Sequence, residues 1–315
     1  MKKIILAIQG ATASGKTSLA IDLAKHFDAE ILSADSRQLY RELNIGVARP
    51  FEDELRQVKH HFIASHSIHD ELTAAVFAKE ARQFSTDYFR HRSVLVLVGG
   101  SGMYVDAFLN GLDELPRDEI LMNEISEDYQ QKGIDYLVNE INKLDQDALA
   151  TIDATNPRRL MRVLEILKIS KLPLAKSRKG ELDPIGIPFK RFSIDWRRKE
   201  LYAKINARVD EMIASGLENE VISLHNFAYL KPLQTVGYQE WSLLNQPGLT
   251  NMDVIEKIKQ HTRNYAKRQL TWLNRYAELI RLDPYAEIPL KNQAISVVEN
   301  CGMIIENLNR HDNKI

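Results

Sequence analysis

The stretch IQGATASGKTSLA, residues 8–20, decides the fold of this chain. From Gly10 to Thr17 it matches the pattern G-x-x-x-x-G-K-[ST]. In such a loop the backbone N–H groups form a concave nest at a helix N-terminus, the lysine adds a positive charge, and the Ser/Thr hydroxyl can bind Mg²⁺. Apolar residues 3–8 precede the loop and a helical pattern follows it from about Lys16 to His26, which is the context that the motif requires. The stretch therefore predicts a phosphate-binding loop in an α/β core.

Further short apolar segments, each suited to a buried parallel strand, recur along the chain. They lie at residues 29–35, 93–98, 189–196 and 277–283, and helical patterns lie at 73–91, 198–228 and 251–274. This alternation predicts an α/β fold, a P-loop NTPase-like parallel sheet flanked by helices. Ligand sites are expected at the carboxyl ends of the strands.

One long segment departs from the alternation of strands and helices. Residues 118–180 are polar, helical in pattern and free of strand signals. We therefore expect residues 1–115 and 186–290 to form the core with its C-terminal helices. Residues 116–185 are expected to form an inserted helical lobe, and residues 291–315 to form a tail.

Composition limits the classes of protein to which the chain can belong. It has 315 residues, 44% of them hydrophobic, and a formal net charge of −1, so any surface that binds nucleic acid must be local. The single cysteine, Cys301, excludes an intrachain disulfide and a cysteine-based metal cluster and favours a reducing, cytoplasmic compartment. The apolar run near the N-terminus leads directly into the phosphate-binding loop, so we expect a strand instead of a targeting signal. No run approaches about 18 apolar residues, and no membrane span is expected.

The carboxylate that should accompany the phosphate-binding loop is displaced. A typical P-loop NTPase has a strand that ends in a Mg²⁺-binding aspartate, whereas VLVLVGGSG, residues 94–102, ends in glycines around Ser101. Those glycines favour close approach of the backbone to a ligand, or a tight turn. Asp35 instead ends the apolar segment 29–35. It can be a catalytic carboxylate beside the loop or a simple turn-former, and the pattern leaves both interpretations open.

Two basic stretches stand out in a chain that is nearly neutral. Residues 257–275 carry six Lys or Arg and no Asp or Glu, with Tyr265 and Trp272 interleaved. Residues 158–179 carry eight Lys or Arg and one acid, Glu165. A charge run is usually a solvated helix face. Two runs together with a phosphate-binding loop favour contact with nucleic acid through neutralisation of its phosphates.

Two further features are weaker. Arg208 lies outside the apolar stripe of its helix, so by pattern alone it is a solvent-facing arginine. His60 and His61 are adjacent, but their spacing does not match that of metal ligands.

Taken together, these segments resemble the tRNA dimethylallyltransferase family, also called isopentenyl-tRNA transferases. The matching segments, in family order from residue 8 to about 283, are GATASGKT, SADSRQLYRELNIGVARP, HHFI, VLVGGSGMYVDAFLNGL, NPRRLMRVLEI, RVDEMIASGLENEV, TVGYQE and YAKRQLTWL. The resemblance implies transfer of a dimethylallyl group from dimethylallyl diphosphate to the exocyclic amine of the tRNA adenosine on the 3′ side of the anticodon. It also implies Mg²⁺ as cofactor, and we expect the chain to act as a monomer.

The resemblance implies roles for individual residues. Asp35 would be the general base on the adenine amine, Thr17 would place Mg²⁺, and Arg208 would reach the diphosphate, which replaces its solvent-facing interpretation. The residues implied to bind the diphosphate are Gly10, Ala11, Thr12, Ala13, Ser14, Gly15, Lys16, Thr17 and Arg208. The residues implied to bind tRNA are Asp35, Ser36, Arg37, Gln38, Ser101, Arg158, Arg159, Leu160, Met161, Arg162, Gln234, Gly237, Tyr238, Lys267, Arg268, Gln269 and Trp272.

The chain departs from the family pattern in a few places. Ala11 stands where the family usually has proline, which should alter the stiffness of the loop and not its chemistry. Ser101 stands where the family usually has threonine, which keeps the hydroxyl. Residues 121–123, LMN, lack an arginine often seen there, and residues 64–74 diverge from the usual acidic, proline-containing version.

Three other functions fit part of the sequence. A P-loop kinase of a small nucleoside or metabolite would use the loop and Asp35 but would leave the basic stretches without a task. A nucleotide-dependent RNA-binding switch would use the basic stretches but not Asp35. An adenylate prenyltransferase would use the same donor and differ in its acceptor.

Overall fold

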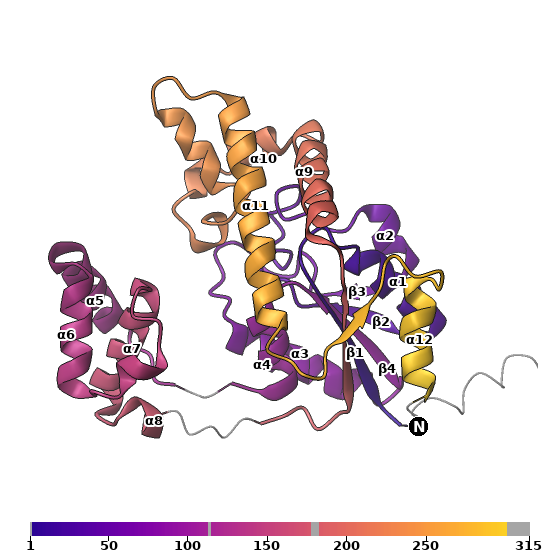
Figure 1. Ribbon diagram of the computed structural model, residues 1–315, viewed down its shortest axis with the longest axis horizontal. Helices are drawn as coiled ribbons and strands as arrows, with labels where there is room; N and C mark the ends of the chain where they lie inside the picture. Colours follow the sequence, from indigo (N-terminus) through magenta and orange to yellow (C-terminus); the bar gives the residue numbers. More distant parts are fainter. Residues whose placement is uncertain (1, 113–114, 178–182, 301–315) are drawn as a thin grey trace, which may run out of the picture. The chain divides into compact units, whose positions relative to one another are not determined.

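The structure, a computed structural model, describes residues 2–112, 115–177 and 183–300 (Figure 1). The chain forms two compact units. The first runs to Leu109 and resumes at Ile185, and the second is Asn110–Pro184. The second unit therefore begins at Asn110 and not at the predicted residue 116, and it ends at Pro184 instead of residue 185.

The first unit is built on a parallel sheet. Its strands are β1 (Ile4–Gln9), β2 (Glu30–Ser33), β3 (His60–His61), β4 (Val94–Gly99), β5 (Phe189–Ile194) and β6 (Ile280–Leu282). Their order is β3-β2-β4-β1-β5-β6, and each strand pairs with its neighbours in parallel. Every residue of β1 and β4 is buried. The predicted P-loop NTPase-like parallel sheet is confirmed.

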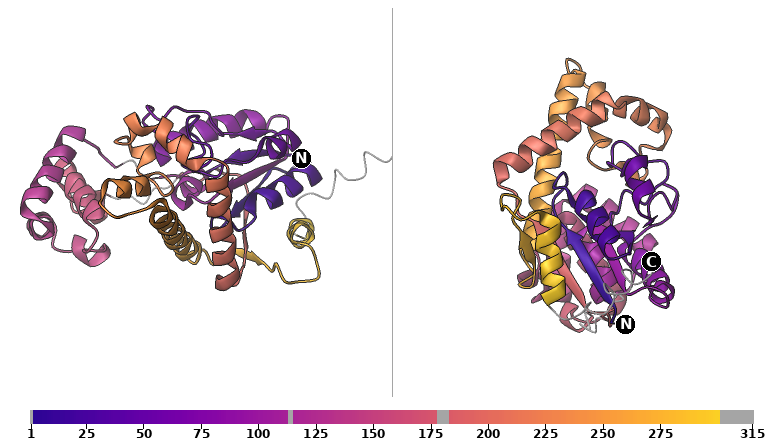
Figure 2. Two further views of the ribbon diagram at one scale, coloured as in Figure 1. Left: turned by 90° about the horizontal axis from the view of Figure 1, so that it is seen from above. Right: turned by 90° about the vertical axis from the view of Figure 1, so that its right-hand side faces the viewer.

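Helices cover both faces of this sheet (Figure 2). The helices of the first unit are α1 (Lys16–His26), α2 (Glu52–Gln57), α3 (Ala74–Tyr88), α4 (Gly102–Asn110), α9 (Arg198–Ala214), α10 (Leu217–Ser223), α11 (Asn251–Leu273) and α12 (Leu290–Asn300), with short 3-10 helices at His225–Phe227, Lys231–Leu233 and Gln239–Asn245. Alternate residues of β1 point to opposite faces. Ile4, Leu6 and Ile8 pack with α1 and α12, whereas Ile5 and Ala7 pack with α3 and α4.

Helix α12 corrects the predicted tail. Residues 290–300 are helical, and Ala294, Ile295 and Val298 are buried in the same core cluster as Leu19 and Leu23 of α1. Their spacing is that of one helix face, a signal that the short length of the segment obscured. Residues 301–315, including Cys301, lie outside the described part of the chain.

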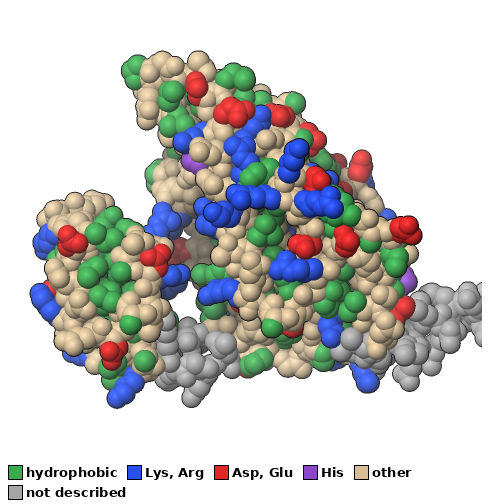
Figure 3. Space-filling view, in the orientation of Figure 1, with side chains coloured by type: hydrophobic (Ala, Val, Ile, Leu, Met, Phe, Trp, Pro, Cys, Tyr) green, Lys and Arg blue, Asp and Glu red, His purple; other side chains and the backbone are tan. Residues whose placement is uncertain are grey.

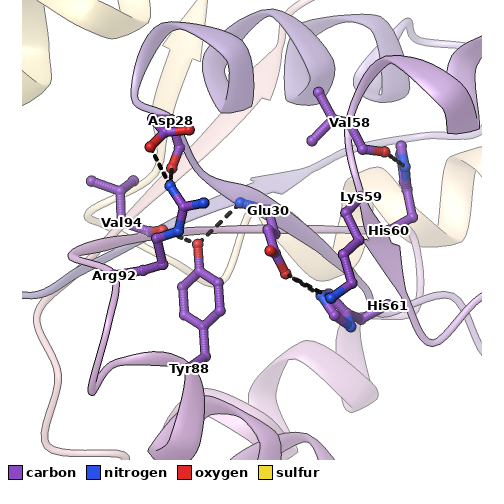
Figure 4. Close-up of polar contacts among 9 residues, drawn as sticks. All are labelled: Asp28, Glu30, Val58, Lys59, His60, His61, Tyr88, Arg92 and Val94. Atoms are coloured by element: carbon purple, nitrogen blue, oxygen red, sulfur yellow. Dashed lines mark hydrogen bonds and ion pairs between the residues drawn. The ribbon is translucent and has the colours of Figure 1, made fainter.

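Strand β3 was not predicted, because two residues are too few to show a pattern. It pairs with β2 through Ile31–His60 and Leu32–His61. Figure 4 shows the polar contacts that hold this edge: His61 Nε2 lies 2.5 Å from Glu30 Oε2, and His60 Nδ1 lies 2.8 Å from the Val58 carbonyl oxygen. Each histidine therefore stabilises the sheet edge through a polar contact with a different protein group.

The second unit is helical, as predicted. It contains α5 (Glu119–Lys132), α6 (Ile134–Leu144), α7 (Pro157–Ser170) and α8 (Leu174–Ser177), with a 3-10 helix at Ala148–Thr151. It has its own core, formed around Ile125, Leu137, Ile141, Leu160 and Leu164. Across the described parts of both units, no helix combines the length and the apolar character that crossing a bilayer requires.

Candidate functional site

A cavity of about 220 Å³ lies in the first unit, at the carboxyl ends of β1, β2 and β4. The phosphate-binding loop, the turn after β2, the segment 46–50, α9 and α11 all contribute to its wall. This is the edge of the sheet where a ligand site is expected in a parallel α/β fold. The cavity brings together Lys16, Thr17, Asp35 and Arg208, which lie far apart in the sequence.

The phosphate-binding loop has the backbone conformation of an anion nest. Gly15 has φ 89° and Ala13 has φ 60°, both in the left-handed region that lets successive N–H groups turn toward one side. Gly15 is also the N-cap of α1, and a glycine supplies no side chain to occupy the first amides of the helix. Those amides have no acceptor within the helix and are available to an anion.

Two cations border the cavity. Burial of the Lys16 ammonium lowers its pKa to about 8, and the like charge of Arg208 adds to this effect, whereas Asp35 opposes it. Lys16 Nζ donates to the Ala11 carbonyl oxygen at 2.8 Å, a neutral partner within the same loop. Burial likewise lowers the pKa of Arg208, although Asp35 opposes the change. Two partly desolvated positive charges facing one cavity form a strong site for an anion.

Asp35 is both a turn residue and a cavity residue. Its Oδ1 accepts from the backbone N–H of Arg37 at 2.9 Å and of Gln38 at 3.4 Å, which is the turn-forming role. Its side chain nevertheless lines the cavity with Lys16 and Arg208. The two interpretations that the sequence left open are therefore compatible, because the turn fixes the carboxylate at the cavity wall.

Ser101 supports this turn from the loop after β4. Its Oγ accepts from the Ser36 backbone N–H at 2.9 Å and donates to Ser36 Oγ at 3.1 Å. Gln38 closes the other side of the turn, since its Nε2 donates to the Ala48 carbonyl oxygen at 2.9 Å. The implied contacts of Ser36, Arg37, Gln38 and Ser101 with tRNA stay predictions.

A clamp on the segment 44–46 was missed by the sequence analysis. The Glu220 carboxylate accepts from the backbone N–H groups of Ile45 at 2.8 Å and Gly46 at 3.0 Å, and from the Tyr238 hydroxyl at 2.5 Å. A Cβ on Gly46 would lie 2.5 Å from the Tyr238 ring, so the close approach requires glycine. Tyr238 is therefore a buried support of the cavity wall, and its implied contact with tRNA stays a prediction.

The other residues implied to bind tRNA in the first unit differ in exposure. Lys267, Arg268 and Gln234 are exposed, and Gly237 is buried. Trp272 is half-buried and its Nε1 donates to the Tyr276 hydroxyl at 2.7 Å. Lysine and arginine side chains gather in the middle of the view in Figure 3. The run 257–275 is partly neutralised, because Lys259 pairs with Asp210 at 2.8 Å and with Glu256 at 3.1 Å.

The residues implied to bind tRNA in the second unit lie at the start of α7. Arg158 and Arg159 are exposed there. Leu160 is buried in the core of the unit and Met161 packs against that core. Arg162 donates to the carbonyl oxygens of Leu115 and Pro116 and pairs with the buried Glu165. Of the five, Arg158 and Arg159 are the exposed cations.

Comparisons with known proteins agree on one family. A family model described as IPP transferase matches residues 38–276. The tRNA dimethylallyltransferase of Chlorobium phaeobacteroides is 42% identical over 280 residues, which cover 86% of this chain and 88% of that relative. The crystal structure of the tRNA isopentenylpyrophosphate transferase of Bacillus halodurans matches with a TM-score of 0.67 and 30% identity, over 96% of each chain. A eukaryotic dimethylallyltransferase acting on tRNA shares the fold at 22% identity, with a TM-score of 0.79 over 95% of this chain and 79% of that one.

Proposed function

The chain belongs to the IPP transferase family, the tRNA dimethylallyltransferases. We propose that its cavity is the active site, where the dimethylallyl group passes from the diphosphate to the adenosine. The chain is a prenyltransferase that moves a dimethylallyl group from dimethylallyl diphosphate to the exocyclic amine of the tRNA adenosine on the 3′ side of the anticodon. The observation that carries the assignment of the site is the cavity that Lys16, Arg208 and Asp35 share.

The diphosphate of the donor would lie in the anion nest. The first amides of α1 and the charges of Lys16 and Arg208 would stabilise it. Apolar side chains of α9, among them Ile205 and Val209, line the same cavity and would contact the five-carbon chain. A single cavity therefore offers both the polar and the apolar surface that an allylic diphosphate needs.

The chemistry follows from these positions. The bond from the first allylic carbon to the diphosphate oxygen breaks, and the bonding electrons leave with the diphosphate, where preorganised charges stabilise them. The adenine amine forms a new bond to that carbon. This amine is a poor nucleophile because its lone pair is delocalised, so a base must take its proton as the bond forms. Asp35, at the cavity wall, would accept that proton.

Mg²⁺ is proposed as cofactor because the residues present suit it. Mg²⁺ is commonly bound by one or two protein oxygens together with substrate phosphates. The described residues offer the Thr17 hydroxyl beside the nest and contain no cluster of three His, Cys, Asp or Glu suited to a protein-only cage. When bound, Mg²⁺ would neutralise charge on the leaving diphosphate.

The acceptor must reach the cavity as an unstacked base. A base inside a stack cannot present its amine to Asp35, so binding should favour a loop nucleotide over a paired one. Exposed arginines and lysines, Arg158, Arg159, Lys267 and Arg268, would neutralise tRNA phosphates. A monomeric acting form and a cytoplasmic location stay predictions.

An acceptor competition tests this proposal. The protein is incubated with labelled dimethylallyl diphosphate, Mg²⁺ and unmodified tRNA, with AMP or ATP as competing acceptors. We expect label in the adenosine next to the anticodon and none in the free nucleotides. Label in AMP alone would show an adenylate prenyltransferase and would contradict the proposal.

A further inference from the structure

Gln269 joins two loops of the cavity. It lies on α11 with 7% of its surface exposed. Its Oε1 accepts from the backbone N–H of Thr12 in the phosphate-binding loop at 2.8 Å. Its Nε2 donates to the carbonyl oxygen of Gly100, in the loop after β4, at 2.9 Å. One side-chain amide therefore holds two backbone segments that are not adjacent in the sequence.

The residue at position 100 must be small to accommodate this amide. A Cβ on residue 100 would lie 2.2 Å from Gln269 Nε2, so the approach of the side chain requires Gly100. The glycines after β4 were expected to let a ligand approach the backbone. At Gly100, the group that approaches is instead a side chain of the protein itself.

The contact continues from Gly100 to the proposed base. Ser101 follows Gly100 directly, and its hydroxyl holds the backbone of Ser36, the residue after Asp35. Tyr265, one helical turn before Gln269 on α11, also lines the cavity. Burial raises the pKa of the Tyr265 hydroxyl to about 12, the Asp35 charge adds to the rise, and a hydrogen bond with Ser101 opposes it. One face of α11 thus contacts both the loop that would hold the leaving group and the loop beside the base.

We propose that Gln269 is a positioning residue that fixes the phosphate-binding loop relative to the Asp35 turn. The inference rests on the proposed function, since the two loops hold the diphosphate and the base. The reacting carbon lies between them, and misplacement by about 1 Å can cost on the order of 100-fold in rate. The amide of Gln269 is engaged with protein backbone, so it sets the geometry of the site in place of the tRNA contact expected from its sequence motif.

The test compares single-turnover rates of prenyl transfer at saturating donor and tRNA. Gln269→Met keeps the length of the side chain and removes both hydrogen bonds. Gly100→Ala keeps Gln269 and displaces its amide. The matched control is Gln246→Met, the same change at an exposed glutamine away from the cavity. Thermal unfolding midpoints and dissociation constants for tRNA are measured on every variant.

We expect Gln269→Met and Gly100→Ala each to lower the single-turnover rate by about 10- to 100-fold, with tRNA affinity within about twofold of wild type. The double variant should be no slower than the worse single variant, because both changes break one linkage. Additive rate losses, an unchanged rate, or a loss confined to tRNA affinity would overturn the inference. Failure of the proposed function would look different, since the wild-type protein itself would then transfer no label.

Discussion

Lys16 and Arg208 line one cavity, and the pKa of Lys16 falls to about 8 because its ammonium is buried and because Arg208 places a second positive charge nearby. These two like charges repel each other, and the Asp35 carboxylate offsets the effect on Lys16 only in part. The site is therefore preorganised for a strongly anionic group, which fits a diphosphate that must leave with its electrons.

The affinity for inorganic diphosphate should depend on the protonation of Lys16. Below pH 8 the ammonium is charged, and above pH 8 it is increasingly neutral in the free protein. The dissociation constant should therefore rise toward tenfold per pH unit above about pH 8, measured by calorimetry. Lys16→Met should bind more weakly and lose this step, and it controls for titration of the diphosphate itself. A step that persists in the variant would show that another group titrates.

The same pKa shift affects folding with the opposite sign. Between about pH 8 and the ordinary lysine pKa, the unfolded chain binds more protons at this position than the folded chain does. The contribution of Lys16 to the free energy of unfolding should therefore rise with pH in that window. Chemical denaturation of wild type and Lys16→Met at pH 7.5 and 9.5 checks this. An equal pH dependence in both proteins would contradict the lowered pKa.

Replacing Arg208 should have two linked effects. Arg208→Met removes a positive charge that would stabilise the leaving diphosphate. We therefore expect kcat/KM for the donor to fall by roughly 100- to 1,000-fold. It also removes the like charge beside Lys16, so the pH at which diphosphate affinity starts to decline should move above 8. Steady-state kinetics and the pH series check both. An unchanged kcat/KM would show that Arg208 lines the cavity without stabilising the leaving diphosphate.

Asp35→Asn should keep the turn after β2 and remove the proposed base. The asparagine Oδ1 can still accept from the Arg37 backbone N–H, so the variant should fold and bind tRNA like wild type. It cannot take the amine proton, and single-turnover transfer should fall by roughly 100- to 10,000-fold. Near-normal turnover would remove Asp35 as the base.

The arginines of α7 should divide into two kinds. Replacing Arg158 and Arg159 by alanine should reduce the salt dependence of tRNA binding, by up to about 2 in the slope of log K against log salt, and leave stability unchanged. Arg162→Ala should instead destabilise the protein by about 3 kcal/mol, because the buried carboxylate of Glu165 loses its ion-pair partner and keeps only the Asp118 backbone N–H. Filter binding across a salt series and chemical denaturation distinguish the two. A flattened salt slope in Arg162→Ala, with stability unchanged, would contradict the division.

Local signals predicted the core of this fold well. Strand β1, the phosphate-binding loop and α1 follow from the single stretch 4–26, because a strand, a glycine-rich loop and a helix are adjacent in sequence. Asp35 was also predictable, since a residue at the carboxyl end of a parallel strand must lie at the ligand edge of the sheet.

Contacts between distant segments were not predictable in the same way. The pattern around Arg208 shows a polar position on a helix, and only the packing of α9 over the cavity turns that position inward. The contact of Gln269 with Thr12 joins residues 257 positions apart, and nothing in either local sequence specifies it. Gly46 and Gly100 were partly informative, because a glycine can indicate that another group lies close to the backbone. The sequence does not identify those groups, which are Tyr238 and Gln269.

The most direct test of the central claim follows both halves of the donor at once. Dimethylallyl diphosphate labelled with carbon-14 in the dimethylallyl group and phosphorus-32 in the terminal phosphate is incubated with the protein, Mg²⁺ and unmodified tRNA. The account predicts all transferred carbon-14 in the tRNA adenosine and all phosphorus-32 released from the donor in free diphosphate. Phosphorus-32 in the tRNA or in any nucleotide would show phosphoryl transfer and would contradict the account.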